Sequence, residues 1–301
     1  MSIAIAVHGG AGTVPAEHMA YAPAGCREAT LAGWRILQAG GSALDAVEAA
    51  VRVLEDDPHF NAGRGSSLTT EGNVEMDAGM MEGQSLNVGA VAGVELIRHP
   101  ISLARKVLES PHVLLVSKGA QRFALEHGME LCRMEDLVTE YQYNRLQKWL
   151  QTPPEQRRKV AKDPEGKHGT VGAVARDQTG KLAAATSTGG IQNQYPGRVG
   201  DSPLVGCGFY ADENAAISCT GYGEDFTRLL IAKRAADFVE RGASAQAAAE
   251  SAIAFLKSRA AGTGGLIIVD QWGQIGFAWN THHLSRGYMC EGMEEPVVGV
   301  E

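Results

Sequence analysis

The most informative stretch of this sequence is Gly169-Thr170-Val171-Gly172-Ala173-Val174-Ala175. A glycine precedes a threonine there, and a short apolar run follows it. If the peptide bond before Thr170 is cleaved, Thr170 becomes a new amino terminus. A threonine hydroxyl is a weak nucleophile at neutral pH, but the α-amine of an N-terminal residue has an unperturbed pKa of about 8 and can serve as its general base. The stretch therefore predicts one residue that holds both the nucleophile and the base.

The segment before this threonine supports cleavage. Residues 151–169 contain three prolines and many charges without apolar periodicity, so they predict a solvated linker. Gly169 permits the strained backbone that attack by Thr170 Oγ on the preceding carbonyl requires. An N-to-O acyl shift followed by hydrolysis would release residues 1–169 and 170–301. On spacing alone, a threonine that opens an ordinary edge strand explains the stretch equally well.

Composition narrows the class of protein. The chain has 301 residues, 44% of them hydrophobic, and a formal net charge of -8, which gives no support for a nucleic-acid partner. No segment has the roughly 18 to 20 apolar residues of a membrane span, and the start lacks a basic region. Five scattered cysteines without a CxxC pair suit a reducing compartment. We therefore expect a cytoplasmic protein with no membrane contact.

The apolar pattern predicts strands and helices in both halves of the chain. Before the linker it predicts strands over 2–8, 89–97 and 113–117, helices over 23–38, 42–55 and 102–109, two more helices ending near 150, a glycine turn over 9–12 and no regular element over 56–83. After the linker it predicts strands over 171–176, 181–187, 206–210, 215–219, 265–269 and 274–279 and helices over 224–240 and 243–259. This predicts an α+β fold with two stacked, mainly antiparallel sheets between helix layers and one core shared by both halves.

Several other chemistries lack their motifs. The HGGAG run at 8–12 is similar to the oxyanion loop of lipases, but the chain has no GxSxG nucleophile elbow. Its nine histidines show no zinc-ligand spacing, and neither GxGxxG nor GxxxxGK[ST] occurs. The sequence thus argues against an α/β-hydrolase, a catalytic zinc site and a nucleotide site.

Six motifs occur in order along the chain: HGGAG at 8–12, NAGRG at 61–65, GTVGAVA at 169–175, AAATSTGG at 183–190, PGRVGDSPLVG at 196–206 and CTGYGE at 219–224. Together they resemble the plant-type (type 2) L-asparaginase / isoaspartyl peptidase family of N-terminal-nucleophile hydrolases, and the resemblance covers nearly the whole chain. It implies a single αββα sandwich domain over 1–301. It also implies a precursor that cleaves itself between Gly169 and Thr170 into an α-subunit (1–169) and a β-subunit (170–301), and an (αβ)₂ assembly.

The resemblance assigns catalytic roles. Thr170 matches the nucleophile, and Thr188 matches a second threonine whose hydroxyl orients or deprotonates it. Thr220 and Gly221 match a hydroxyl and a backbone N–H that stabilise the oxyanion, and Asn61 reaches the active site. Outside this motif context, the threonines are explained by β-propensity alone.

The resemblance also implies the substrates, L-asparagine and β-aspartyl dipeptides, and their binding residues. Arg198 and Asp201 lie in a loop framed by glycine and proline, where a guanidinium suits an α-carboxylate and a carboxylate suits an α-ammonium. In isolation, a surface ion pair also explains them. Gly221 and Gly223 complete the implied substrate-binding set.

No organic cofactor is implied, but a structural monovalent cation, sodium, is. The positions that match its backbone-carbonyl ligands are Leu54, Glu55, Asp57, Phe60, Ala62 and Arg64. The chain departs from the family pattern at Trp279 and Leu284, where Phe and Met are more usual. This departure bears on the pocket wall and on the preference among leaving groups.

Two other functions stay open. A glycosylasparaginase-like enzyme would remove sugar from asparagine, and the lack of a secretory signal argues against it. An uncleaved, inactive relative would instead bind aspartate-like ligands, and it would run as one band near 31.8 kDa.

Overall fold

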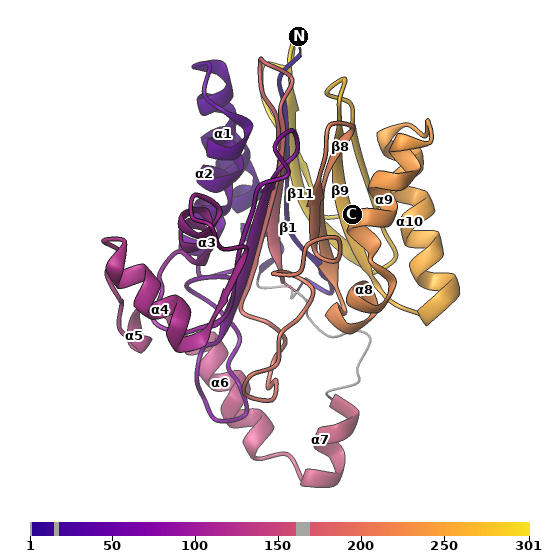
Figure 1. Cartoon of the computed structure of the whole chain (residues 1–301). Coiled ribbons are helices and arrows are strands. Elements are labelled where there is room, and N and C mark those ends of the chain that lie inside the picture. The colour runs from indigo at the N-terminus through magenta and orange to yellow at the C-terminus, as the bar shows by residue number, and fades with distance from the viewer. Residues whose placement is uncertain (1, 15–17, 161–168) are drawn as a thin grey trace.

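Two stacked β-sheets form the centre of the molecule (Figure 1). The computed structural model describes residues 2–14, 18–160 and 169–301. Within them, the larger sheet has the strand order β12 (Val297–Gly299), β11 (His283–Cys290), β1 (Ala4–Gly12), β5 (Val171–Arg176), β6 (Leu182–Thr188), β2 (Met76–Glu82), β3 (Val88–Val94) and β4 (Leu114–Val116). The smaller sheet has the order β10 (Ile275–Trp279), β9 (Gly264–Asp270), β8 (Ala215–Gly221) and β7 (Phe209–Ala211). Neighbouring strands are antiparallel except β3 and β4, which are parallel.

Helices cover both outer faces of this pair of sheets. On the larger sheet lie α1 (Tyr21–Gln38), α2 (Ala43–Asp56), α3 (Pro100–Leu108) and α4 (Ser117–Glu126), and on the smaller sheet lie α9 (Ile231–Glu240) and α10 (Ala245–Ala260). The remaining helices are α5 (Met134–Leu137), α6 (Glu140–Leu150), α7 (Pro154–Val160) and α8 (Gly223–Leu229). The four layers confirm the predicted αββα sandwich. None of the helices in the described ranges is long and apolar enough to cross a lipid bilayer.

Strand alternation builds the core between the layers. In β1, Ile5 and Val7 join the cluster under α1 and α2, whereas Ala4 and Ala6 face the second sheet. The cluster between the sheets also contains Phe209, so segments from both sides of Thr170 contribute to it. Both halves therefore share the cluster between the sheets, but the single core that was predicted is three apolar clusters, the other two lying under the two helix layers.

The predicted glycine turn over 9–12 is wrong, because β1 continues through it to Gly12. Its pairing with β11 shifts register between His8 and Ala11, and Gly10 has φ of 109°. This is a β-bulge, which leaves the strand paired while bending it. The partner strand β11 was not predicted, and neither was β12.

Three other predictions need correction. The region 56–83, where no regular element was expected, contains β2. The linker over 151–169 contains α7, which begins with Pro154 and has Glu155 in its first turn, both favourable at a helix start; residues 161–168 of that linker lie outside the described ranges. The helix predicted over 224–240 is two helices, separated at Leu230 where φ is 52°.

Candidate active site

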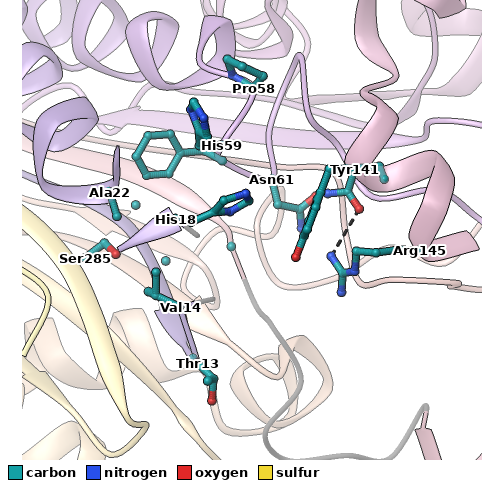
Figure 2. A pocket seen from close by; sticks show the side chains of 16 residues that line it. Thr13, Val14, His18, Ala22, Pro58, His59, Asn61, Tyr141, Arg145 and Ser285 are labelled. Atoms are coloured by element: carbon teal, nitrogen blue, oxygen red, sulfur yellow. Dashed lines mark hydrogen bonds between the residues drawn. The ribbon is translucent and has the colours of Figure 1, made fainter. Parts of the chain in front are cut away.

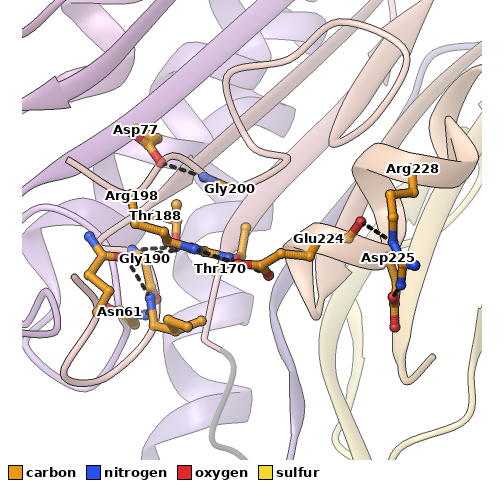
Figure 3. Close-up of polar contacts among 12 residues, drawn as sticks. Asn61, Asp77, Thr170, Thr188, Gly190, Arg198, Gly200, Glu224, Asp225 and Arg228 are labelled. Carbon is orange, nitrogen blue, oxygen red and sulfur yellow. Dashed lines mark hydrogen bonds and ion pairs between the residues drawn. The ribbon is translucent and has the colours of Figure 1, made fainter. Parts of the chain in front are cut away.

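Thr170 lies directly before β5, in the middle of the larger sheet, and is only 7% exposed. Its hydroxyl donates to Thr188 Oγ1 at 3.1 Å, as Figure 3 shows. The register of β5 and β6 pairs Val171 with Ser187, so Thr170 and Thr188 lie opposite each other at the end of the hairpin. Thr188 Oγ1 also accepts from the Gly190 backbone N–H at 3.0 Å. The structure thus brings together the two threonines that the sequence singled out.

Asn61 fixes the turn behind Thr188. Its Nδ2 donates to the Gly190 carbonyl at 2.6 Å, and its Oδ1 accepts from the Ser67 N–H at 2.7 Å. A Cβ at Gly169 would lie 2.8 Å from Asn61 Cβ, so glycine at 169 permits this close approach. Asn61 therefore borders the peptide bond before Thr170 and supports Thr188 through Gly190.

A histidine that sequence reasoning did not assign to the site holds the other end of Thr170. His8 Nδ1 lies 3.1 Å from the Thr170 carbonyl oxygen, and His8 Nε2 lies 2.8 Å from Ser218 Oγ. Burial lowers the pKa of His8 to about 3, so the ring is neutral at physiological pH. Since a carbonyl only accepts, Nδ1 carries the proton and Nε2 accepts from Ser218.

The pocket for this histidine depends on a glycine in β5. A Cβ at Gly172 would collide with Ser218 Oγ and with His8 Nε2. Ser218 Oγ is also 2.6 Å from Thr186 Oγ1, which lies on β6. One buried polar chain therefore links β6, β8 and β1 to the backbone of Thr170. In the sequence, Gly172 was the signal that could have pointed to this chain of buried polar groups.

Thr220 and Gly221 end β8. Thr220 lies two residues after Ser218, so both side chains project from the same face of the strand. Thr220 Oγ1 accepts from the Ala11 N–H at 3.1 Å, which fixes its hydroxyl against the bulge of β1. A Cβ at Gly221 would lie 2.5 Å from the Phe226 ring and 2.6 Å from the Thr263 carbonyl oxygen, so the backbone here requires glycine. Neighbouring groups thus fix both residues at the end of β8, as the predicted oxyanion role would require.

Arg198 and Asp201 come together around Gly223. If Gly223 carried a Cβ, that atom would lie 2.9 Å from Arg198 Nη2 and 2.9 Å from Asp201 Oδ1. The guanidinium does not pair directly with Asp201. Instead, its Nε and Nη2 donate to the two carboxylate oxygens of Glu224 at 3.0 and 2.9 Å (Figure 3). This fork shows that Arg198 is shaped to receive one carboxylate in bidentate fashion. Glu224 is a further residue that the sequence did not single out.

The carboxyl groups near Arg198 are strongly perturbed. Burial raises the pKa of Asp201 to about 7, against the opposing effect of the Arg198 charge. Burial likewise raises the pKa of Asp77 to about 6, although Asp77 accepts from the N–H groups of Gly93 and Gly200. Asp201 Oδ2 is buried without a hydrogen-bond partner among the described residues. A cationic group of a ligand would satisfy this oxygen.

The predicted cation segment folds back on itself after α2. The Glu55 carbonyl accepts from the Arg64 N–H at 2.8 Å. A Cβ at Gly65 would lie 2.6 Å from the carbonyl oxygens of both Pro58 and Phe60, so these oxygens converge on one side of the loop. Clustered neutral carbonyls are the donors that a hard monovalent cation accepts. Of the two converging oxygens, that of Phe60 belongs to the predicted set and that of Pro58 does not, so the expected cation stays a prediction.

A pocket opens beside the predicted cleavage point (Figure 2). Gly169 and Asn61 line it together with Gly9, Gly10 and Gly12 of β1. Its outer wall contains His18, His59, Tyr141 and Arg145. None of the four substrate-binding positions named above lines this pocket, which reaches the nucleophile region at Gly169.

Comparison with known proteins agrees with this geometry. A family model described as asparaginase matches residues 1–298. The plant-type L-asparaginase of Pyrococcus furiosus is 48% identical over 307 residues, covering 99% of this chain and 100% of that protein. The isoaspartyl peptidase/L-asparaginase of Mus musculus is 44% identical over 284 residues, covering 93% of this chain and 86% of that protein. The chain therefore belongs to the asparaginase family that this model, Asparaginase_2, describes.

Proposed function

We propose that this chain is an autocatalytically processed amidohydrolase. It hydrolyses the side-chain amide of L-asparagine, and it hydrolyses the peptide bond of β-aspartyl dipeptides. The observation that carries the proposal is the hydrogen bond from the Thr170 hydroxyl to Thr188 Oγ1. Thr170 follows Gly169 directly and precedes β5. The names of the relatives, plant-type L-asparaginase and isoaspartyl peptidase/L-asparaginase, supply the substrates.

The reaction follows from a free amine on Thr170. The amine accepts the hydroxyl proton while Oγ attacks the β-carbonyl carbon of the substrate, and Thr220 and the Gly221 N–H stabilise the oxyanion. The C–N bond then breaks, and ammonia or an amino acid leaves with the proton that the amine returns. Water, deprotonated by the same amine, attacks the ester at Thr170 and releases L-aspartate.

Recognition of the aspartyl part falls to the Arg198 loop. Arg198 would exchange Glu224 for the α-carboxylate of the substrate, keeping a bidentate pair. Asp201 Oδ2, which lacks a partner among the described residues, would accept from the α-ammonium. Gly223 leaves the space beside Arg198 and Asp201 open because it carries no side chain, and Gly221 would contribute its backbone N–H.

Three further features belong to the same proposal. Sodium would bind the carbonyls of residues 54–64, and the melting temperature of the protein should then be higher in sodium salts than in choline salts.

Two processed units would pair as (αβ)₂. The exposed apolar side chains of Val113, Leu114 and Val116 at the β4 edge support this pairing, and gel filtration tests it. The five free cysteines fit a reducing cytoplasm.

A denaturing gel with intact-mass measurement and N-terminal sequencing tests the proposal. We expect two bands, the smaller of which begins TVGAVA, and hydrolysis of L-asparagine and of a β-aspartyl dipeptide. A single band near 31.8 kDa with aspartate binding but no hydrolysis would favour the inactive binding protein instead. Faster hydrolysis of a glycosyl-asparagine than of either substrate would favour the glycosylasparaginase-like alternative.

A further inference from the structure

The pocket beside Gly169 contains a guanidinium that forms no ion pair with an Asp or Glu in the part of the chain that the structure describes. We propose that this pocket is the subsite for the amino acid released from β-aspartyl dipeptides, with Arg145 binding the α-carboxylate of that leaving group. The inference rests on the proposed function. It adds Arg145 as a residue that favours β-aspartyl dipeptides over L-asparagine.

The charge of Arg145 is the first support. Arg145 Nη1 donates to Gln142 Oε1 at 3.3 Å, and its guanidinium lies 5.4 Å from the centre of the Tyr141 ring. No Asp or Glu among the described residues forms an ion pair with it, whereas Arg105 contacts three carboxylates and Arg198 is held by one. Burial lowers the pKa of Arg145, against the opposing effect of Tyr141. A half-buried cation of this kind is stabilised when an anion binds.

The lining of the pocket is the second support. Its walls contain no Asp or Glu within the described ranges, although the chain as a whole carries a net charge of -8. His18, His59 and Tyr141 form an aromatic wall, with ring centres 5.4 Å apart for His18 and His59 and 4.8 Å apart for His18 and Tyr141. Figure 2 shows Tyr141 and Arg145 on one side of the pocket and Ala22 and Ser285 on the other. Such a space suits an α-carboxylate attached to an apolar side chain.

The position of the pocket is the third support. Gly169 lines it, so it adjoins the residue at which the substrate bond is broken. Arg198 and Asp201, which would hold the aspartyl part, do not line it. With the acyl part of the substrate at the Arg198 loop and the attacked carbon at Thr170, the departing part has this pocket available. Ammonia from L-asparagine has no group that could reach Arg145, but the amino acid of a dipeptide does.

The test compares two substrates on one processed enzyme. For Arg145→Gln we expect the ratio of kcat/KM for β-aspartyl-leucine to kcat/KM for L-asparagine to fall about 10- to 100-fold. The fall would result from the loss of a charge-assisted bidentate pair with the leaving group. Arg145→Lys should keep part of the ratio, because it retains the charge without the fork. Arg157→Gln is the matched control, because Arg157 also lies over an aromatic ring, that of Trp149, but does not line the pocket. It should leave the ratio unchanged.

A third substrate isolates the carboxylate. The wild-type enzyme should prefer β-aspartyl-leucine to its C-terminal amide, and Arg145→Gln should remove that preference. The inference is overturned if the variant keeps the wild-type ratio for all three substrates. It is also overturned if the variant impairs only the appearance of the two fragments, because Arg145 would then serve the new carboxylate of Gly169. If the wild-type protein hydrolyses none of the three, the proposed function itself has failed.

Discussion

The nucleophile region and the Arg198 loop lie side by side but differ in how their polar groups are satisfied. Around Thr170, the side chains of Thr188, His8 and Ser218 all hydrogen-bond within the described residues. In the loop, Asp201 Oδ2 and Ser202 Oγ are buried without a hydrogen-bond partner among the described residues, and Arg198 forms its ion pair with the half-exposed Glu224.

This difference separates two tasks. Groups that act on the reacting bond gain from being fixed before the substrate arrives, since they then need no reorganisation during the reaction. Groups that recognise a charged ligand gain from being incomplete without it, because the ligand then supplies the missing partner. Changes in the first region should therefore lower kcat, and changes in the second should alter binding.

Thr170→Ala should give the largest effect. It removes the hydroxyl needed both for the acyl shift and for turnover, so we expect no fragments and a loss of activity of about 10⁴-fold or more. Gel analysis and an asparagine assay measure both. Thr170→Ser is the control, since it keeps a hydroxyl and should keep both activities in part. Two fragments from the alanine variant would contradict the assignment of the nucleophile.

Thr220→Val should come next. It keeps the shape of the side chain while removing the hydroxyl, so we expect kcat to fall by about 10²- to 10³-fold with little change in KM. Thr30→Val is a matched control, because Thr30 is also fully buried, and its hydroxyl donates to the Cys26 carbonyl within α1. A change in KM without a change in kcat would show that Thr220 acts in substrate recognition and not in stabilising the oxyanion.

His8→Leu tests whether the backbone of Thr170 needs its hydrogen bond. The change leaves the Thr170 carbonyl and Ser218 without their shared partner, and we expect kcat to fall by about 10- to 100-fold at similar KM. His8→Asn can still donate to the carbonyl and should recover part of the loss. Equal kcat for the two variants would show that the histidine only fills space.

The pH dependence of product binding should show the smallest effect and belongs to the recognition region. Asp201 has a pKa of about 7, so it is neutral below that pH and can pair with an ammonium group only above it. The inhibition constant of L-aspartate should therefore rise about tenfold between pH 8 and pH 6, following the ionised fraction. The inhibition constant is the right quantity because it reports the binding of L-aspartate and not the rate of the chemical step. An inhibition constant equal at both pH values would exclude Asp201 as the ammonium partner.

Much of the fold could be predicted where local signals suffice. The helix predicted over 42–55 is α2, and Ser42 caps it by accepting from the Asp45 N–H. The turn between β5 and β6 is fixed by Asp177, whose carboxylate accepts from the N–H groups of Thr179 and Lys181. Each of these interactions spans only a few residues, so their residue types identify them.

What was missed depends on distant partners. β2 contains Gly79, which no strand propensity favours, but the ring of Phe209 occupies the space where its Cβ would lie. β11 contains Arg286, whose guanidinium lies 4.7 Å from the ring centres of both Phe277 and Trp279. Contacts of this kind do not appear in local patterns.

The same reason explains the site. The threonine and loop positions were found through their motifs, and the structure places Thr188 against Thr170 and Arg198 next to Asp201 around Gly223. His8 and Ser218 are 210 residues apart, and only the folded sheets bring them together. The partnership of Arg198 with Glu224 likewise depends on the position of α8, which no spacing rule gives.

The strand order of the larger sheet has a consequence for the products of cleavage. β1 comes from before Gly169, yet it pairs with β11 and β5, which both come from after it, and β2 pairs in turn with β6. The two polypeptides would thus be interwoven, and neither could leave without breaking backbone ladders on several edges. Each would be the template on which the other folds, so separately expressed halves should recover the native state only when they refold together.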